Sequence, residues 1–537
     1  MRNKLSRLTV LAGSLALVLL PALARAQPAN GEPGDAERQR IEKSLEELRA
    51  MKSDLARTMR DFDKRIKKLE SAMARTPAAP APTNHKPAPA APAAEPATVV
   101  EAADTQSQSR TVAANPPPVP SVPASGPADK PDDSGFLGSW GTYQPGRGFV
   151  LVRGSYGEIS ASLIAYARYL NQLGLDKTYT DSFGRTFPIH LRQDVQWNKV
   201  NLSFRGWLFD PNFTYRVWIW TQQPAMGEGA QVVVGGQLGY HFADYLNVYA
   251  GIAPLPSTRS TNWTYPFWLK MDNRTFADEF FRASYSQGVW ADGTITDGLE
   301  YRVMIANNLS ALGIAASQLD AEFNTMSGAI TWMPTTGEFG PAEGFGDFEG
   351  HEDVATLFAL HYTRSREDKQ QQPSVDDIEN TQIRLADGTR IFAFNAFNTG
   401  GQINKATYQM FDAEAGVKYL GFSLEAEFYW RWVNDFNVTG FIPVHHLYDT
   451  GYQVQASAMI LPRQLQIYAA GSQIFGAPYG DPWDVTVGLN WYPFDRREMH
   501  INTQAIYNSH SPVGGLSYPY VVGGNGWLFN TDIIVSF

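Results

Sequence analysis

The stretch Trp527-Leu-Phe-Asn-Thr-Asp-Ile-Ile-Val-Ser-Phe537 alternates between two kinds of side chain. Phe537, Val535, Ile533, Thr531, Phe529 and Trp527 form a set that is almost entirely apolar, and the residues between them are mostly polar. Because successive side chains of a strand point to opposite faces, the stretch predicts a strand with one apolar face. Its length is about that of one tilted membrane-crossing strand. We therefore expect a barrel wall in lipid, with the terminal strand of a soluble sandwich as the alternative.

The same alternation recurs across residues 136–537. Predicted strands with this pattern lie at 149–153, 159–169, 199–208, 215–220, 452–460, 483–491 and 499–507. The polar members are Asn, Gln, Ser, Thr, Asp and Arg, which indicates a hydrated interior, and several strands end in Trp or Tyr, as at a membrane interface. At about 25 residues per strand and loop, the region predicts an all-β transmembrane barrel of about 16 antiparallel strands. A barrel of that size leaves an aqueous channel.

The connections fall into three predicted classes. Tyr492–Glu498 is a tight periplasmic turn, and Asp292–Gly298 has the Asp-Gly chemistry of a hairpin turn. Two long polar stretches, Met333–Asp353 and Thr363–Lys405, are expected to be external loops. Leu255–Phe281 is rich in aromatic and basic residues and does not alternate, so we expect it to fold into the lumen and narrow the pore, with another outward loop as the alternative.

The N-terminal part has a different composition. Residues 1–26 carry Arg and Lys, then an apolar core and Ala24-Arg25-Ala26, which predicts a secretory signal removed before Gln27. Residues 36–74 predict a periplasmic α-helical coiled coil, because its apolar residues are spaced alternately by four and three. The seam residues are Ile41, Leu45, Leu48, Lys52, Leu55, Met59, Phe62, Ile66, Leu69 and Met73. Residues 75–135 are rich in Pro and Ala and are expected to be a disordered linker.

Composition excludes several function classes. The chain has no Cys, so disulfides and thiolate-metal sites are excluded. A net charge of -10 argues against a nucleic-acid partner, whose binding footprint is basic. The sequence contains no Gly-x-Ser-x-Gly, His-Glu-x-x-His or Walker pattern, and His445-His446 is the only His pair. We therefore expect neither an enzyme nor a cofactor or metal, although sequence order alone does not exclude a lipase-type hydrolase site.

Short pieces of the first half of the barrel region resemble the phosphate-selective porin (porin O/P) family of bacterial outer-membrane porins. These pieces are Val200–Gly206, Tyr215–Trp218, Tyr245–Ser257, Met271–Arg274, Gln287–Gly293, Asp297–Arg302 and Ile305–Asn308. The C-terminal strand is similar to the one that the outer-membrane assembly machinery reads. The resemblance implies a homotrimer of 16-stranded barrels in the outer membrane, with the N-terminal segment in the periplasm and interior Arg and Lys side chains that guide anions.

Seven basic residues are the candidates for a pore-lining, anion-binding ring: Arg168, Lys199, Arg205, Arg216, Arg259, Lys270 and Arg274. The family carries a denser basic cluster near the position of Arg205, where this chain has Asn201-Leu-Ser-Phe. Residues 136–537 contain 25 basic and 38 acidic residues, a net of -13, so selectivity would depend on the local field at a constriction. Each candidate could instead pair with Asp194, Asp272, Asp278 or Glu279 in a structural network.

The sequence therefore predicts an outer-membrane porin for passive diffusion of small hydrophilic solutes, with small anions such as phosphate as the expected cargo. Its expected partners are two further copies of the chain and outer-membrane lipid. One alternative is a structural tether that reaches the cell wall through the coiled coil. Another is a sugar porin, in which Trp218, Trp220, Trp263 and Trp268 would stack on sugar rings.

Overall fold

The computed structural model describes residues 141–144, 147–222, 231–271, 273–312, 318, 322–373, 381–514 and 519–537. The predicted signal (1–26), coiled coil (36–74) and linker (75–135) lie outside the described residues. No helix within the described ranges is long and apolar enough to span a membrane.

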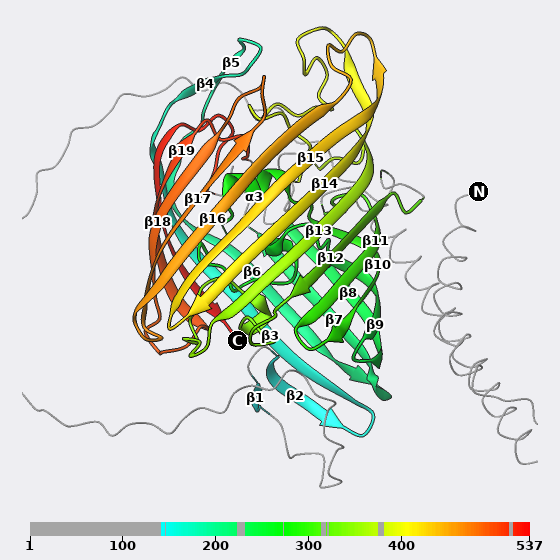
Figure 1. The fold of residues 1–537 in the computed structure, drawn as a ribbon, viewed down its shortest axis with the longest axis vertical. Helices are drawn as coiled ribbons and strands as arrows, with labels where there is room; N and C mark the ends of the chain where they lie inside the picture. Colours follow the sequence, from blue (N-terminus) through cyan, green and yellow to red (C-terminus); the bar gives the residue numbers. More distant parts are fainter. Residues whose placement is uncertain are drawn as a thin grey trace, which may run out of the picture. The chain divides into compact units, whose positions relative to one another are not determined.

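Sixteen antiparallel strands close into a barrel (Figure 1). In chain order they are β3 (Gly157–Leu175), β6 (Gln193–Leu208), β7 (Asp210–Gln222), β8 (Gln231–Ala243), β9 (Leu246–Pro254), β10 (Tyr285–Thr296), β11 (Leu299–Asn307), β12 (Thr325–Trp332), β13 (Ala355–Asp368), β14 (Gln402–Tyr419), β15 (Phe422–Thr439), β16 (Leu447–Leu461), β17 (Leu465–Phe475), β18 (Trp483–Trp491), β19 (Met499–Ser509) and β20 (Gly526–Ser536). Each pairs with the next, and β20 pairs back onto β3 from Ser536↔Ile164 to Gly526↔Leu175. The predicted all-β barrel of about 16 strands is confirmed.

Two small additions flank this ring. β1 (Tyr143–Gln144) pairs with β2 (Gly148–Gly154), and β2 pairs with the first residues of β3, which β20 does not reach. β4 (Thr178–Thr180) and β5 (Thr186–Pro188) form a separate hairpin in the connection from β3 to β6. In Figure 1 the pair β1–β2 lies at the end of the barrel that holds the C-terminus, and β4–β5 lies at the opposite end.

The strands alternate as the sequence predicts. On β20, Phe529 is 49% exposed on the outer face, whereas its neighbour Asn530 is 1% exposed and faces the interior. The same contrast runs along β18, where Val485 and Val487 are exposed and Asp484 and Thr486 are buried. The outside of the ring is therefore apolar, and the polar alternates face inward.

The connections divide between two ends of the barrel. Most of those at the end that holds the C-terminus are tight; the β10–β11 hairpin, for instance, turns at Asp297-Gly298, where Gly298 adopts a φ of +69°. The predicted tight connection Tyr492–Glu498 joins β18 to β19 at this same end, which we call the short-turn end.

The prediction for Met333–Asp353 is wrong. This connection joins β12 to β13 at the short-turn end. Every strand takes the chain to the other end of the barrel, and two strands, β11 and β12, separate this connection from the tight β10–β11 turn, so both lie at the same end. Length and polarity do not determine the end at which a loop lies. The prediction for Thr363–Lys405 was too wide: β13 continues to Asp368 and β14 begins at Gln402, so the connection at the opposite end comprises residues 369–401.

Leu255–Phe281 folds into the lumen, as predicted. We call residues 255–284 the inward segment; it joins β9 to β10 and contains the helix α3 (Phe276–Phe281), which Figure 1 shows inside the ring of strands. The helix contacts β15, β16, β17 and β18 on the far wall. There the Phe276 main-chain N–H donates to Asp484 Oδ1 at 3.1 Å, and the Ala277 N–H donates to Ser472 Oγ at 3.0 Å.

Candidate functional site

The interior of the barrel has two unlike walls. The inward-facing residues of β12–β20 are nearly all buried, because the inward segment and the connections 333–354 and 369–401 pack against them. We call this side the covered wall. Its side chains hold the inward segment by direct hydrogen bonds: the amides of Asn490 and Asn502 both donate to the Leu269 carbonyl oxygen, at 3.1 and 3.2 Å.

Four of the seven predicted basic residues form ion pairs within the inward segment, between it and the covered wall, or on the barrel wall that it contacts. Arg168 pairs with Asp532 and also donates to Asn273, Arg259 pairs with Glu425 at 2.8 Å, Lys270 with Asp484 at 3.4 Å, and Arg274 with Asp278 at 3.9 Å and Glu279 at 3.5 Å. Asp278 and Glu279 are therefore structural partners, as the sequence suggested, whereas Asp532, Glu425 and Asp484 were not foreseen. All four basic side chains are largely removed from water, and they hold the inward segment in place.

Lys270 shows how strongly this packing acts on a charge. Burial lowers the pKa of Lys270, and the neighbouring Asp484 carboxylate opposes that effect only in part. The Lys270 ammonium also donates to the hydroxyl of Tyr520 at 2.8 Å. Lys270 is thus positioned by two groups from distant parts of the chain, and it is 1% exposed.

Residues 333–354, which we call the mouth segment, cross the short-turn end and meet the inward segment there. The Phe345 N–H donates to the Phe267 carbonyl oxygen at 2.7 Å, and Arg259 donates to the Glu343 carbonyl oxygen at 2.8 Å. The Lys418 ammonium on β14 donates to the carbonyl oxygens of Phe339 and Gly344, each at 2.6 Å. The two segments are therefore joined to each other and to the covered wall.

A second anchor of the mouth segment is a His–Asp pair. Asp347 binds the His351 imidazole and accepts from the Gly421 N–H at 2.7 Å. The hydrogen bond to Asp347 raises the pKa of His351. Burial alone would raise the pKa of Asp347, but the hydrogen bonds from His351 and Gly421 outweigh it and lower that pKa.

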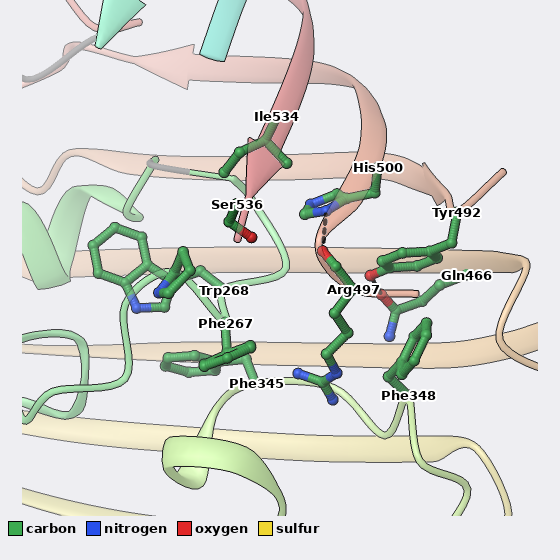
Figure 2. A pocket seen from close by; sticks show the side chains of 11 residues that line it. Phe267, Trp268, Phe345, Phe348, Gln466, Tyr492, Arg497, His500, Ile534 and Ser536 are labelled. Atoms are coloured by element: carbon green, nitrogen blue, oxygen red, sulfur yellow. Dashed lines mark hydrogen bonds between the residues drawn. The ribbon is translucent and has the colours of Figure 1, made fainter. Parts of the chain in front are cut away.

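A small pocket marks the seam between the two segments and the wall (Figure 2). It is lined by Phe267 and Trp268 of the inward segment, by Phe345 and Phe348 of the mouth segment, and by Gln466, Tyr492, Arg497 and His500 among others. The Arg497 guanidinium lies 5.0 Å from the Phe348 ring centroid and forms an ion pair with Glu349 at 2.6 Å. Aromatic packing and a neutralised cation suit a joint between segments better than a path for ions.

The other wall keeps partly exposed polar side chains in the lumen. They come from the short-turn halves of β6–β11, and cross-strand register places them on the inner face. We call this set the open wall; it comprises Asn201, Arg205, Arg216, Gln237, Asn247, Asp292 and Arg302. Asp292 and Arg302 form an ion pair at 3.6 Å, and their side chains are 21% and 22% exposed.

Arg205 and Arg216 are the two predicted residues that lie on the open wall. They are direct register partners on β6 and β7, so two guanidinium groups stand side by side. Arg216 Nε donates to Ser203 Oγ at 3.0 Å, and Arg205 Nε has no hydrogen-bond partner among the described residues. Within the described part of the chain, no ion pair joins either side chain to a carboxylate. Adjacent like charges without a counterion create a field that attracts anions.

Two further arginines, which the sequence did not single out, extend this basic region. Arg147 and Arg153, at the two ends of β2, lie 3.1 and 2.7 Å from the carboxylate of Glu158. Glu158 faces inward beside the register pair Ser160↔Arg205. Arg147 and Arg153 therefore share the one carboxylate of Glu158, and Arg205 follows on the neighbouring strand. The sequence signal was weak, because only their position beside the first predicted strand distinguishes Arg147 and Arg153.

Lys199, the remaining predicted residue, is buried among aromatic rings. Its ammonium lies 4.5 Å from the Trp220 ring and 5.5 Å from the Tyr265 ring. Trp218 and Trp220 pack with Leu312, whereas Trp268 packs with Leu269 and Phe345 in a separate cluster. The tryptophans considered for sugar stacking are thus distributed over separate packed clusters and do not form a row of open ring faces.

No protein-family model matches the chain, and no curated protein sequence matches it. Among solved structures, it is similar to an anion-selective porin from Comamonas acidovorans, with 10% identity, a TM-score of 0.43, and 71% of this chain and 100% of the other covered. OmpF of Salmonella typhi, in complex with daunomycin, has 12% identity and a TM-score of 0.43, with 72% and 99% covered. The outer-membrane channel DcaP of Acinetobacter baumannii has 9% identity and a TM-score of 0.43, with the same coverage. At such low identity, function has to be argued from this chain's own residues.

Proposed function

We propose that the protein is a passive outer-membrane porin for small hydrophilic solutes, with a preference for anions. One observation carries this proposal: a closed barrel, apolar outside and polar inside, holds the unneutralised pair Arg205 and Arg216 on a partly exposed interior wall. Such a wall can attract and pass anions without binding them in a closed pocket.

The outer surface supports a membrane location. Exposed apolar side chains follow one another around the ring, for example Leu424, Val487 and Trp491, which are 52%, 52% and 49% exposed. Apolar surface in water costs about 25 cal/mol per Å², and a band that encircles the molecule exceeds what soluble proteins expose. A closed barrel also leaves no unpaired strand edge in lipid, and outer-membrane proteins use this architecture.

The anion preference rests on local charge. The barrel region as a whole is acidic, but the acidic excess is concentrated on the covered wall, where Asp412, Glu414, Glu425 and Glu427 are buried. The partly exposed interior carries Arg205 and Arg216 beside Arg147 and Arg153, with Glu158 as the nearby carboxylate. In a low-dielectric channel these local charges dominate the field that a solute meets. Phosphate is the oxyanion we propose to test first.

We also propose a homotrimer whose N-terminal coiled coil (36–74) lies in the periplasm. The heptad seam supports this assembly, since such seams drive self-association. Deletion of residues 36–134 should lower the oligomer number measured by light scattering while conductance persists. A trimer that survives the deletion would place the association in the barrel instead, and an envelope defect without a change in conductance would favour the tether function.

The test of the function is conductance in planar lipid bilayers, with ion selectivity measured from the reversal potential. The purified full chain should give stepwise currents with anion preference, and the double variant Arg205→Gln/Arg216→Gln should lose most of that preference. Arg496→Gln is the matched control, because Arg496 is exposed in the connection between β18 and β19. An absence of steps would refute the porin, whereas cation preference in the wild type would refute only the anion part.

A further inference from the structure

Four titratable side chains converge on the covered wall, and among the described residues none of them forms an ion pair with a Lys or Arg. His361 of β13, Asp412 and Glu414 of β14 and Glu427 of β15 all face the interior, and each is at most 7% exposed. His361 and Asp412 are register partners, as are Glu414 and Glu427. The sheet therefore brings one imidazole and three carboxylates from adjacent strands to one place.

The orientation of His361 is fixed by the inward segment. His361 Nδ1 lies 3.2 Å from the Pro256 carbonyl oxygen. A carbonyl oxygen can only accept, so Nδ1 carries the proton, and Nε2 of the neutral ring presents its lone pair. That nitrogen is 3.8 Å from Asp412 Oδ2 and 4.0 Å from Glu414 Oε1. It has no hydrogen-bond partner in the described structure, and it points at the carboxylates.

The carboxylates are equally short of partners. Both oxygens of Asp412, Oε2 of Glu414 and Oε1 of Glu427 make no hydrogen bond among the described residues, and only the other oxygen of Glu427 accepts, from the Tyr429 hydroxyl at 2.6 Å. Arg259 lies nearby, but its guanidinium is already bonded to Glu425 and to the carbonyl oxygens of Glu343 and Gly344. Buried, ionised carboxylates beside an imidazole lone pair are unfavourable unless a cation lies among them or protons neutralise them.

We infer that His361, Asp412 and Glu414 bind a divalent transition-metal ion of the Zn²⁺ class, with Glu427 as a fourth donor. Mixed imidazole and carboxylate donors suit Zn²⁺, whereas Ca²⁺ and Mg²⁺ take oxygen ligands. A ligating His usually donates its other ring N–H to a carbonyl or carboxylate, and Pro256 has this role here.

The donors are slightly too far apart for a closed site. Two donors on one tetrahedral Zn²⁺ lie about 3.4 Å apart. His361 Nε2 lies 3.8 and 4.0 Å from the nearest oxygens of Asp412 and Glu414, so side-chain rotations have to bring these donors closer together. As they stand, no three His, Cys, Asp or Glu side chains of the described ranges form a group that could hold a metal ion, so the proposed site requires these side chains to move. Because Pro256 belongs to the inward segment, the bound ion would tie that segment to the covered wall.

The experiment is Zn²⁺ binding to the purified full chain in detergent, after treatment with a chelator and dialysis. The wild type should bind one Zn²⁺ per chain, measured by calorimetry and by metal analysis. His361→Gln and Asp412→Asn should each weaken binding by at least about tenfold, the size of effect seen when a metal site loses a supporting group. His446→Gln, an exposed His in the connection before β16, should bind like the wild type.

Two outcomes would overturn the inference. One is a wild type that takes up no stoichiometric Zn²⁺, which would leave protonation alone to neutralise the cluster. The other is binding by His361→Gln and Asp412→Asn as tight as that of the wild type. If the variants fail to fold, Co²⁺ added to the wild type decides: absorption bands of Co²⁺ with nitrogen and oxygen ligands support the site, and the spectrum of the hydrated ion refutes it. Either result would leave the porin function untouched, because bilayer conductance tests that function separately.

Discussion

The covered wall and the open wall have the same alternating pattern, yet they differ in what their polar side chains do. At the edge of the covered wall, Asp532 of β20 and Arg168 of the adjoining strand β3 neutralise each other in a fully buried pair, with Asn273 of the inward segment bonded to the same guanidinium. On the open wall, Arg205 and Arg216 stand together, partly exposed. A polar inward face therefore does not by itself mark a path for solutes, because the segments inside a barrel decide which part of that face meets water.

The largest effect is expected when the inward segment, which covers one wall and leaves the other open, is removed. Replacement of residues 257–282 by a short Gly/Ser linker would uncover the buried carboxylates Asp412, Glu414, Glu425 and Asp484. Conductance should rise, and selectivity should shift toward cations, since the newly exposed charges are acidic. The measurement is bilayer conductance with reversal potentials in a salt gradient. Unchanged conductance in a folded variant would mean that the inward segment does not limit the lumen.

A matched pair of substitutions sharpens the comparison. Arg168→Gln leaves Asp532 buried without its partner, and removal of one partner from a buried pair costs about 3–5 kcal/mol. Arg205→Gln removes a charge without a counterion, so it should cost far less stability. The measurements are heat-induced unfolding in detergent and ion selectivity. Arg168→Gln should lower the unfolding temperature, and Arg205→Gln should change the ion selectivity. Equal changes in both properties for both variants would remove the distinction between the walls.

The smallest expected effect is a pH dependence of the mouth segment. The pKa of His351 is raised above its ordinary 6.5. Its contribution to the stability of the mouth segment is therefore complete below pH 6.5 and is lost as pH rises through the raised pKa. The pKa of Asp347 is lowered below its ordinary 3.8, so its contribution is present above pH 3.8 and is lost as pH falls through the lowered value. The anchor should thus be strongest between these two pH values.

Hydrogen exchange at the N–H groups of Gly350 and His351, which donate to Asp347, measures this dependence once intrinsic rates are corrected for pH. Protection should fall from mildly acidic to alkaline pH in the wild type, and His351→Gln should flatten that fall. The same slope in both proteins would show that the pair does not hold the segment.

The sequence predicted the barrel well because a two-residue period reports directly on which side of a strand each residue lies. It also predicted the inward segment, since Leu255–Phe281 breaks that period with aromatic and basic residues. It could not place Met333–Asp353, because the side on which a loop emerges depends on how many strands precede it. Nor could it identify the partners of Arg259 and Lys270, since Glu425 and Asp484 come from strands far along the chain.

The most direct test of the account uses the absence of Cys from the chain, which makes any introduced Cys unique. Gln237→Cys places a thiol on the open wall, and Thr486→Cys places one on the covered wall. With a small water-soluble, negatively charged thiol reagent applied to channels in a bilayer, the Gln237→Cys channel should react rapidly and lose current, whereas Thr486→Cys should not react. Equal reaction at both positions, or reaction at Thr486→Cys alone, would contradict the assignment of the solute path to the open wall.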